Sequence, residues 1–151
     1  MGNSTEGVRI ACEAAESAIA GLKKQLEALG NSSENIKFTF DPKSERHLLS
    51  VLCPYRVRLL VSYRNNVTNS LCDALFYFIL AHSKDMWIDD SSNRDVVKRH
   101  TLKPNFDHTL KLVWSENDLS LTTEQLTAFV LDALVMEISK HHAEAEAKKQ
   151  L

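Results

Sequence analysis

The chain has 151 residues, of which 44% are hydrophobic and 25% charged, and its formal net charge is -2. A chain of this length and composition fits one globular domain, residues 1–151, which buries roughly 70% of the surface that the unfolded chain exposes. The charge balance gives no overall attraction for nucleic acid or anionic membranes. No apolar stretch reaches the ~18 residues that a membrane span requires, so we expect no membrane partner.

The cysteines and the N-terminal segment bear on the cellular compartment. Cys12, Cys53 and Cys72 form no CxxC pair and are odd in number, which is typical of reduced thiols in a cytosol. Glu13 and Glu16 interrupt the apolar residues near the N-terminus, so no run is long enough for a signal peptide. The sequence therefore predicts a cytoplasmic protein whose cysteines are small core residues.

Residues 8–29 predict an N-terminal helix, because their apolar positions recur at alternating steps of four and three. These positions are Val8, Cys12, Ala15, Ile19, Leu22, Leu26 and Leu29, and Gly30 follows as the C-cap residue. One interpretation is that the stripe packs on the domain's own sheet. The other is that it binds a partner or a second copy, since so narrow a stripe is typical of coiled coils. The partner-binding residues would then be Val8, Ile19, Leu22, Leu26 and Leu29.

Three strands are expected next. Residues 36–40 alternate between apolar and polar side chains and stop at the turn signal Asp41-Pro42. Residues 46–53 fit either a short helix or the second strand of a hairpin, and we favour the strand because Pro54 leaves little room for a helix. Residues 55–64 alternate clearly. Their core-facing set is Tyr55, Val57, Leu59, Val61 and Tyr63, and their outward set includes Arg56, Arg58 and Arg64.

The middle of the chain is less certain. Apolar residues at helical spacing favour a buried helix over residues 67–83, with a strand through Phe76–Leu80 as the rival interpretation. Residues 96–102 and 107–114 then flank Lys103-Pro104-Asn105 and predict a β-hairpin.

The C-terminal region has the best-specified signals in the chain. Thr122 and Gln125 fit a capping box, and Leu121 and Leu126 flank it as a hydrophobic staple. The helix that follows has an apolar face made of Leu126, Phe129, Val130, Ala133, Leu134 and Ile138. We therefore expect an α+β fold: a helix, a three-stranded meander, a helix, a β-hairpin and a C-terminal helix, with helices packed on an antiparallel sheet. Residues 36–139 form the sheet-and-helix core, and residues 140–151 form a frayed tail.

This element order, together with the closing segment LSLTTEQLTAFVLDALVMEI, resembles the YbjN-type and type III secretion chaperone-like family. The residues that carry the resemblance are Leu121, Thr122, Glu124, Gln125, Leu126, Leu131 and Leu134. The resemblance implies a small, non-enzymatic binding protein that is often a dimer.

Histidines are the first candidates for chemistry. His141 and His142 are adjacent, so they cannot ligate one ion from a helix as residues four apart can. His142 and Glu146 have that spacing, but two surface ligands would make only a weak metal site. His100 and His108 could approach each other across the predicted hairpin, while His82 fits a core histidine. We therefore expect no metal site and no catalytic residue among them.

Charged clusters give two further candidates. The acidic run contains Asp85, Asp89, Asp90 and Asp95 but lacks the glycine and glutamate positions of an EF-hand loop, so it predicts a solvated loop. Arg56, Arg58, Arg64 and Arg99 could form an anion-binding sheet face if their strands are neighbours. The alternative is that these arginines only keep an exposed strand face soluble.

The sequence favours a non-enzymatic protein-binding module, chaperone-like or regulatory, that acts through an apolar groove or the N-terminal helix and forms a dimer without a cofactor. The alternative function is nucleic-acid or phospholigand binding through the arginine face. A third hypothesis is a small enzyme. It requires one of His82, His100 and His108 to converge with one of Asp85, Asp89 and Asp107 in a concave pocket.

Overall fold

The computed structural model describes residues 5–28, 36–41, 46–64, 75–82 and 96–150. Its elements are α1 (Thr5–Ala28), β1 (Ile36–Asp41), β2 (Arg46–Leu52), the 3-10 turn η2 (Pro54–Arg56), β3 (Val57–Arg64), β4 (Leu75–His82), β5 (Val96–Phe106), β6 (Leu112–Glu116), β7 (Leu119–Thr122) and α2 (Thr123–Lys149). The strands form one antiparallel sheet in the sequential order β1 to β7. The α+β class is confirmed, and the sheet is larger than the expected three-stranded meander.

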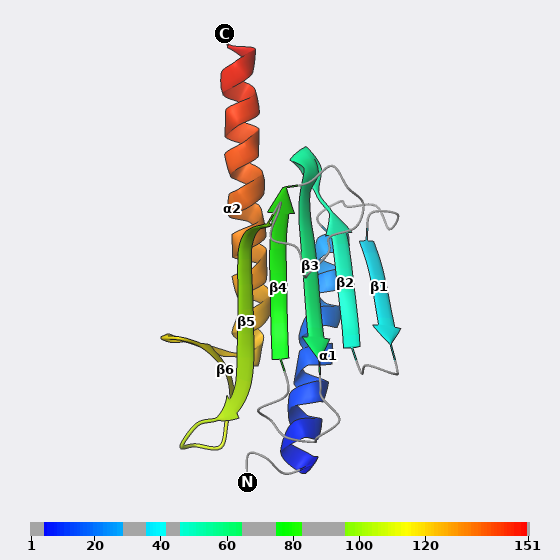
Figure 1. Ribbon diagram of the computed structural model, residues 1–151, viewed down its shortest axis with the longest axis vertical. Coiled ribbons are helices and arrows are strands. Elements are labelled where there is room, and N and C mark those ends of the chain that lie inside the picture. The colour runs from blue at the N-terminus through cyan, green and yellow to red at the C-terminus, as the bar shows by residue number, and fades with distance from the viewer. Residues whose placement is uncertain (1–4, 29–35, 42–45, 65–74, 83–95, 151) are drawn as a thin grey trace.

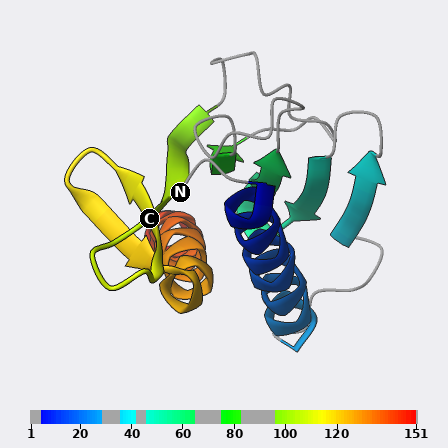
Figure 2. The same cartoon turned by 90° about the horizontal axis from the view of Figure 1, so that it is seen from below.

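Both helices cover the same face of the sheet (Figure 1). α1 packs on β2 and β3, whereas α2 packs against β3, β6, β7 and α1. Seen along the long axis, the β6–β7 hairpin lies on the far side of α2 and β1 lies beyond α1 at the opposite edge (Figure 2). The sheet therefore curves around α2, while β1 extends past the helical layer. None of the helices in the described segments is long and apolar enough to cross a membrane.

The helix predicted over residues 67–83 is wrong where the structure describes it, because residues 75–82 form β4. Phe76, Phe78 and Leu80 belong to the core beneath the helices. Ile79 and Ala81, which point to the other face of the sheet, are also buried. A strand that is buried on both faces is apolar at consecutive positions, and such a run lacks the alternation that identifies a half-buried strand. Residues 67–74 lie outside the described part of the chain.

The turn predicted at residues 103–105 is also wrong. β5 continues through Pro104, which pairs with Trp114 of β6. The first part of β5 pairs with β4 and its last four residues pair with β6, so this strand joins the two halves of the sheet. The turn comes later, where the Asp107 carboxylate accepts hydrogen bonds from the backbone N–H groups of Thr109 (2.8 Å) and Lys111 (3.0 Å). The Thr109 hydroxyl also donates to this carboxylate (2.6 Å), and this hydrogen bond, together with those from the backbone, holds the pKa of Asp107 below its ordinary value.

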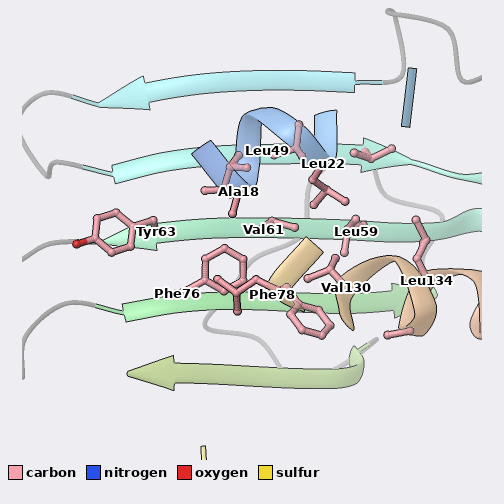
Figure 3. Close-up of a cluster of buried hydrophobic side chains, with 14 of the residues drawn as sticks. Ala18, Leu22, Leu49, Leu59, Val61, Tyr63, Phe76, Phe78, Val130 and Leu134 are labelled. Atoms are coloured by element: carbon pink, nitrogen blue, oxygen red, sulfur yellow. The ribbon is translucent and has the colours of Figure 1, made fainter. Parts of the chain in front are cut away.

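The core lies between the sheet and the two helices (Figure 3). The core-facing set predicted for β3 is confirmed for Val57, Leu59, Val61 and Tyr63, which are buried. The opposite face, expected to be outward, is buried too, with Arg58 6%, Leu60 5% and Ser62 0% exposed. Tyr55, assigned to the same strand, instead lies in η2 and is exposed. Trp114 of β6 is fully buried, with its ring 6.2 Å from that of Tyr63 and 5.9 Å from that of Phe76. Large aromatic contacts thus connect β6 to the middle of the sheet.

The predicted start of α2 is confirmed. The Thr122 hydroxyl accepts a hydrogen bond from the Gln125 N–H (3.3 Å), and the Gln125 side chain accepts one from the Thr122 N–H (2.9 Å), which completes the capping box. The buried residues of α2 are Leu126, Val130, Ala133 and Leu134, as its periodicity predicts. Residues 140–149, expected as a frayed tail, continue the helix and project past the sheet (Figure 1).

Candidate interaction surface

The apolar stripe of α1 faces the interior of the domain. Ile19, Leu22 and Leu26 are at most 1% exposed and belong to the same core as the sheet residues. The stripe therefore packs on the domain's own sheet, which is the first of the two interpretations of this helix. A partner could reach these three side chains only if α1 left the sheet. The side chain of Val8 and residue Leu29 lie outside the described part of the structure.

The four arginines are distributed over separate places. Arg56 belongs to η2, outside the strand to which its sequence pattern assigned it, and has a positive φ of 62°. Arg58 is only 6% exposed, whereas Arg64 is exposed at the other end of β3. Six residues of strand separate these two positions by about 20 Å. Arg99 lies two strands away on β5. The described structure places Arg58, Arg64 and Arg99 on one sheet and Arg56 in a turn, and the four do not form one compact patch.

His100 takes part in a partly buried contact that ties β5 to β6. Its Nδ1 lies 2.6 Å from Oε1 of Glu116, and Oε2 of Glu116 accepts a hydrogen bond from the Thr101 N–H (2.7 Å). Partial burial acts to raise the pKa of Glu116, but the hydrogen bonds from Thr101 and His100 and the attraction of the His100 charge together lower it. The imidazole packs against the rings of Phe78 and Phe129, each 5.1 Å away, and these two rings also contact each other at 5.7 Å. The pair therefore fixes the register of the β5–β6 junction.

His82, His141 and His142 form contacts between α2 and one end of the sheet. The ring of His82, at the end of β4, stacks on that of His141 at 4.2 Å, and Nε2 of His141 lies 2.9 Å from Glu137. The Tyr55 hydroxyl lies 2.5 Å from Nδ1 of His142. Tyr55 has a positive φ of 61°, a strained conformation for a non-glycine residue. The turn η2 is thus held in a conformation that directs its tyrosine to α2.

Within the described segments, no group of three or more His, Cys, Asp or Glu side chains could hold a metal ion. The acidic run at Asp85, Asp89, Asp90 and Asp95 lies outside those segments. Burial raises the pKa of the Cys53 thiol to about 11, an effect that Arg58 only partly offsets. The thiol is therefore protonated at neutral pH and is a poor nucleophile.

β1 carries two partly exposed aromatic side chains, Phe38 and Phe40. Phe38 is 39% exposed and Phe40 is 50% exposed. The register places Phe38 opposite Leu49, so Phe38 belongs to the face that the helices cover. α1 packs on β2 and β3, and β1 lies beyond it at the edge of the sheet (Figure 2). The Lys23 ammonium of α1 lies 5.7 Å from the centre of the Phe38 ring.

β1 is also the first strand in the sheet order, and in the part of the chain that the structure describes it pairs with β2 alone. Its outer edge, beside which the described segments place no strand, lies next to two partly exposed aromatic rings. Proteins commonly shorten, charge or cover such an edge, because another strand can pair with it. A six-residue edge strand with exposed phenylalanines has the features of a docking site for an extended polypeptide.

Sequence reasoning missed this surface although it predicted the strand. The alternation over residues 36–40 identified Phe38 and Phe40 as one face of a strand, and such a face is ordinarily core. Which strand lies at an edge depends on long-range pairing, and how far a helix extends over the sheet depends on tertiary packing. The sequence holds no local signal for either property.

The chain was compared with protein-family models, with curated proteins and with solved structures, and none of the three comparisons found a match. The resemblance to the YbjN-type family therefore stays a prediction.

Proposed function

We propose that this protein is a binding module that holds another polypeptide by strand addition at the outer edge of β1. The observation that carries the proposal is the pair of exposed rings, Phe38 and Phe40, on a six-residue edge strand. This retains the protein-binding function that the sequence favours and moves it from α1 to β1, because the α1 stripe is buried in the core.

Strand addition combines two contributions. Backbone groups on the outer side of an edge strand such as β1 can form hydrogen bonds with an extended chain, which gives affinity without sequence preference. The two phenylalanine rings add apolar area that selects a complementary side chain, and aromatic residues of this kind dominate many interfaces. Burying the exposed part of each ring would contribute on the order of 1–2 kcal/mol. Such a surface supports binding without any chemical step.

The phospholigand alternative has weaker support in the geometry. A site for a phosphate backbone needs several basic side chains within reach of one strand of nucleic acid. Arg58 is buried, and the other three arginines lie in a turn, at a strand end and on a different strand. In contrast, the outer side of β1 brings two aromatic rings and a strand edge together in one short segment.

The test compares affinity capture by three forms of the full chain from a lysate of the cells that express it. These are the wild type, Phe40→Lys, and Met136→Lys as a matched control at an exposed position on α2, where Met136 is 70% exposed. Hydrogen exchange of the β1 amides is then measured in the captured complex. We expect the wild type and Met136→Lys to hold the same polypeptide, with slowed β1 exchange, and Phe40→Lys to lose it. Equal capture by all three forms, or unchanged β1 exchange in the complex, would overturn the proposal.

A further inference from the structure

We infer that the polypeptide added to β1 is the β1 strand of a second copy of this chain, paired antiparallel about a two-fold axis with Thr39 opposite Thr39. This inference rests on the proposed function and names its partner. It is carried by the self-complementary order of residues in β1, whose sequence is IKFTFD.

Symmetry first limits the registers that are available. Two antiparallel neighbouring strands can be related by a two-fold axis only when the axis is perpendicular to the sheet, so both copies keep their helices on the same face. Directly opposite residues in an antiparallel pair point to the same face. Phe38 and Phe40 point to the helix face, and Thr39 points to the other. A phenylalanine of one copy must therefore oppose an even-numbered residue of the other.

Centring the pair on Thr39 satisfies every position from 37 to 41. Phe38 of each copy lies opposite Phe40 of the other, which gives two aromatic pairs, and the two Thr39 residues face each other. By sequence, position 37 is a lysine and position 41 an aspartate, so the same register sets opposite charges across the interface at both ends. Aromatic, threonine and opposite-charge pairs are the cross-strand combinations that stabilise antiparallel sheets. One six-residue strand thus supplies both halves of an isologous interface.

Shifting the register by two residues loses this complementarity. With Phe38 opposite itself, position 37 lies opposite Thr39, and position 41 lies opposite no residue of β1. With Phe40 opposite itself, Phe38 lies opposite a position outside β1. Only the register centred on Thr39 places each phenylalanine opposite a phenylalanine of the second copy and sets positions 37 and 41 opposite each other.

The helical layers leave room for this arrangement. α1 lies over β2 and β3, so about four strand spacings, roughly 19 Å, would separate the two copies of α1 across the interface. Packed helices lie 8–10 Å apart, so the two helices do not collide. The space between them falls directly over the rings of Phe38 and Phe40 from both copies. The rings that are exposed in one chain would therefore fill the gap between two.

The experiment uses two separate variants of the full chain, Lys37→Asp and Asp41→Lys, each of which reverses the charge at one end of the strand. In the proposed register each variant alone sets like charges opposite each other at both ends, which we expect to raise the dimer dissociation constant about tenfold or more. An equimolar mixture restores an opposite-charge pair at both ends and should form a one-to-one heterodimer. Native mass spectrometry distinguishes the three species when one variant is isotope-labelled.

A mixture that gives no more dimer than either variant alone would overturn the inference, as would a monomeric wild type at high micromolar concentration. Circular dichroism of each variant identifies a loss of folding, and recovery of the dimer on mixing shows that both chains are competent. One further result distinguishes failure of this inference from failure of the proposed function. A monomeric chain that still loses its partner through Phe40→Lys refutes self-pairing but retains strand addition with a different polypeptide.

Discussion

The two edges of the sheet are built differently. β7 has four residues, leads directly into α2, and packs the half-buried side chains of Leu119 and Leu121 against the core. β1 has six residues, extends past α1, and exposes Phe38 and Phe40. One edge is thus short and integrated with the chain's own helix, which is a common way to prevent further pairing. This contrast is the reason for proposing strand addition at β1 rather than at β7.

The largest expected effect is on the free energy of unfolding, and it compares a buried residue of β6 with an exposed residue of β1. Trp114→Ala removes a fully buried ring that contacts Tyr63 and Phe76, so we expect it to lower the free energy of unfolding by about 3–5 kcal/mol. Phe40→Ala, at a half-exposed position, should lower it by less than about 1 kcal/mol in the monomer. Urea unfolding at low protein concentration measures both values. Comparable losses would contradict the assignment of Phe40 to the surface.

A smaller effect is expected at the junction of β7 and α2. Thr122→Ala removes the side chain that accepts the Gln125 N–H and begins α2. Loss of such a cap costs about 1 kcal/mol, and the same urea series measures it. Thr122→Ser keeps a hydroxyl and should recover most of the stability. Equal losses in the two variants would show that the methyl group, rather than the hydrogen bond, matters here.

The smallest expected effect concerns pH at the β5–β6 junction. The pKa of Glu116 is lowered by its contacts with Thr101 and His100 despite partial burial. A carboxylate whose folded-state pKa is depressed stabilises the fold above its unfolded pKa, and this contribution is lost as the pH falls through the folded value. We therefore expect Glu116→Gln to cost about 1 kcal/mol at pH 7 and progressively less below pH 4.5.

Unfolding of wild type and Glu116→Gln across pH 3 to 7 measures this difference. His100→Ala in the same series removes one of the two contacts and should retain part of the pH dependence, because the Thr101 N–H still binds the carboxylate. A difference between wild type and Glu116→Gln that does not change with pH would contradict a charged role for this side chain.

Local signals allowed part of the fold to be predicted. The cap at Thr122, the apolar face of α2 and the core-facing side chains of β3 each depend on residues near one another in the sequence, and all three are confirmed. The face of β3 expected to be outward is buried instead. β4 was misread as a helix because both of its faces are buried and its side chains do not alternate in polarity. Pro104 was misread as a turn because proline ordinarily ends strands, whereas here β5 changes partner at that point.

The candidate surface could not be predicted for a different reason. The apolar stripe of α1 was a candidate partner surface because it is narrow, but whether a stripe is covered depends on the sheet beneath it. The exposure of Phe38 and Phe40 likewise depends on strand order and on the position of α1, which are properties of the folded chain. Sequence periodicity identifies apolar faces, and the tertiary structure decides which of them remain uncovered.

The most direct test of the account is hydrogen exchange of the β1 amides measured over a range of protein concentrations, with the β7 amides as the internal reference. The account predicts that exchange at residues 36–41 slows as concentration rises through the dimer dissociation constant, while exchange at residues 119–122 stays constant. Association that leaves the β1 amides unchanged, or that protects β7 instead, would contradict it.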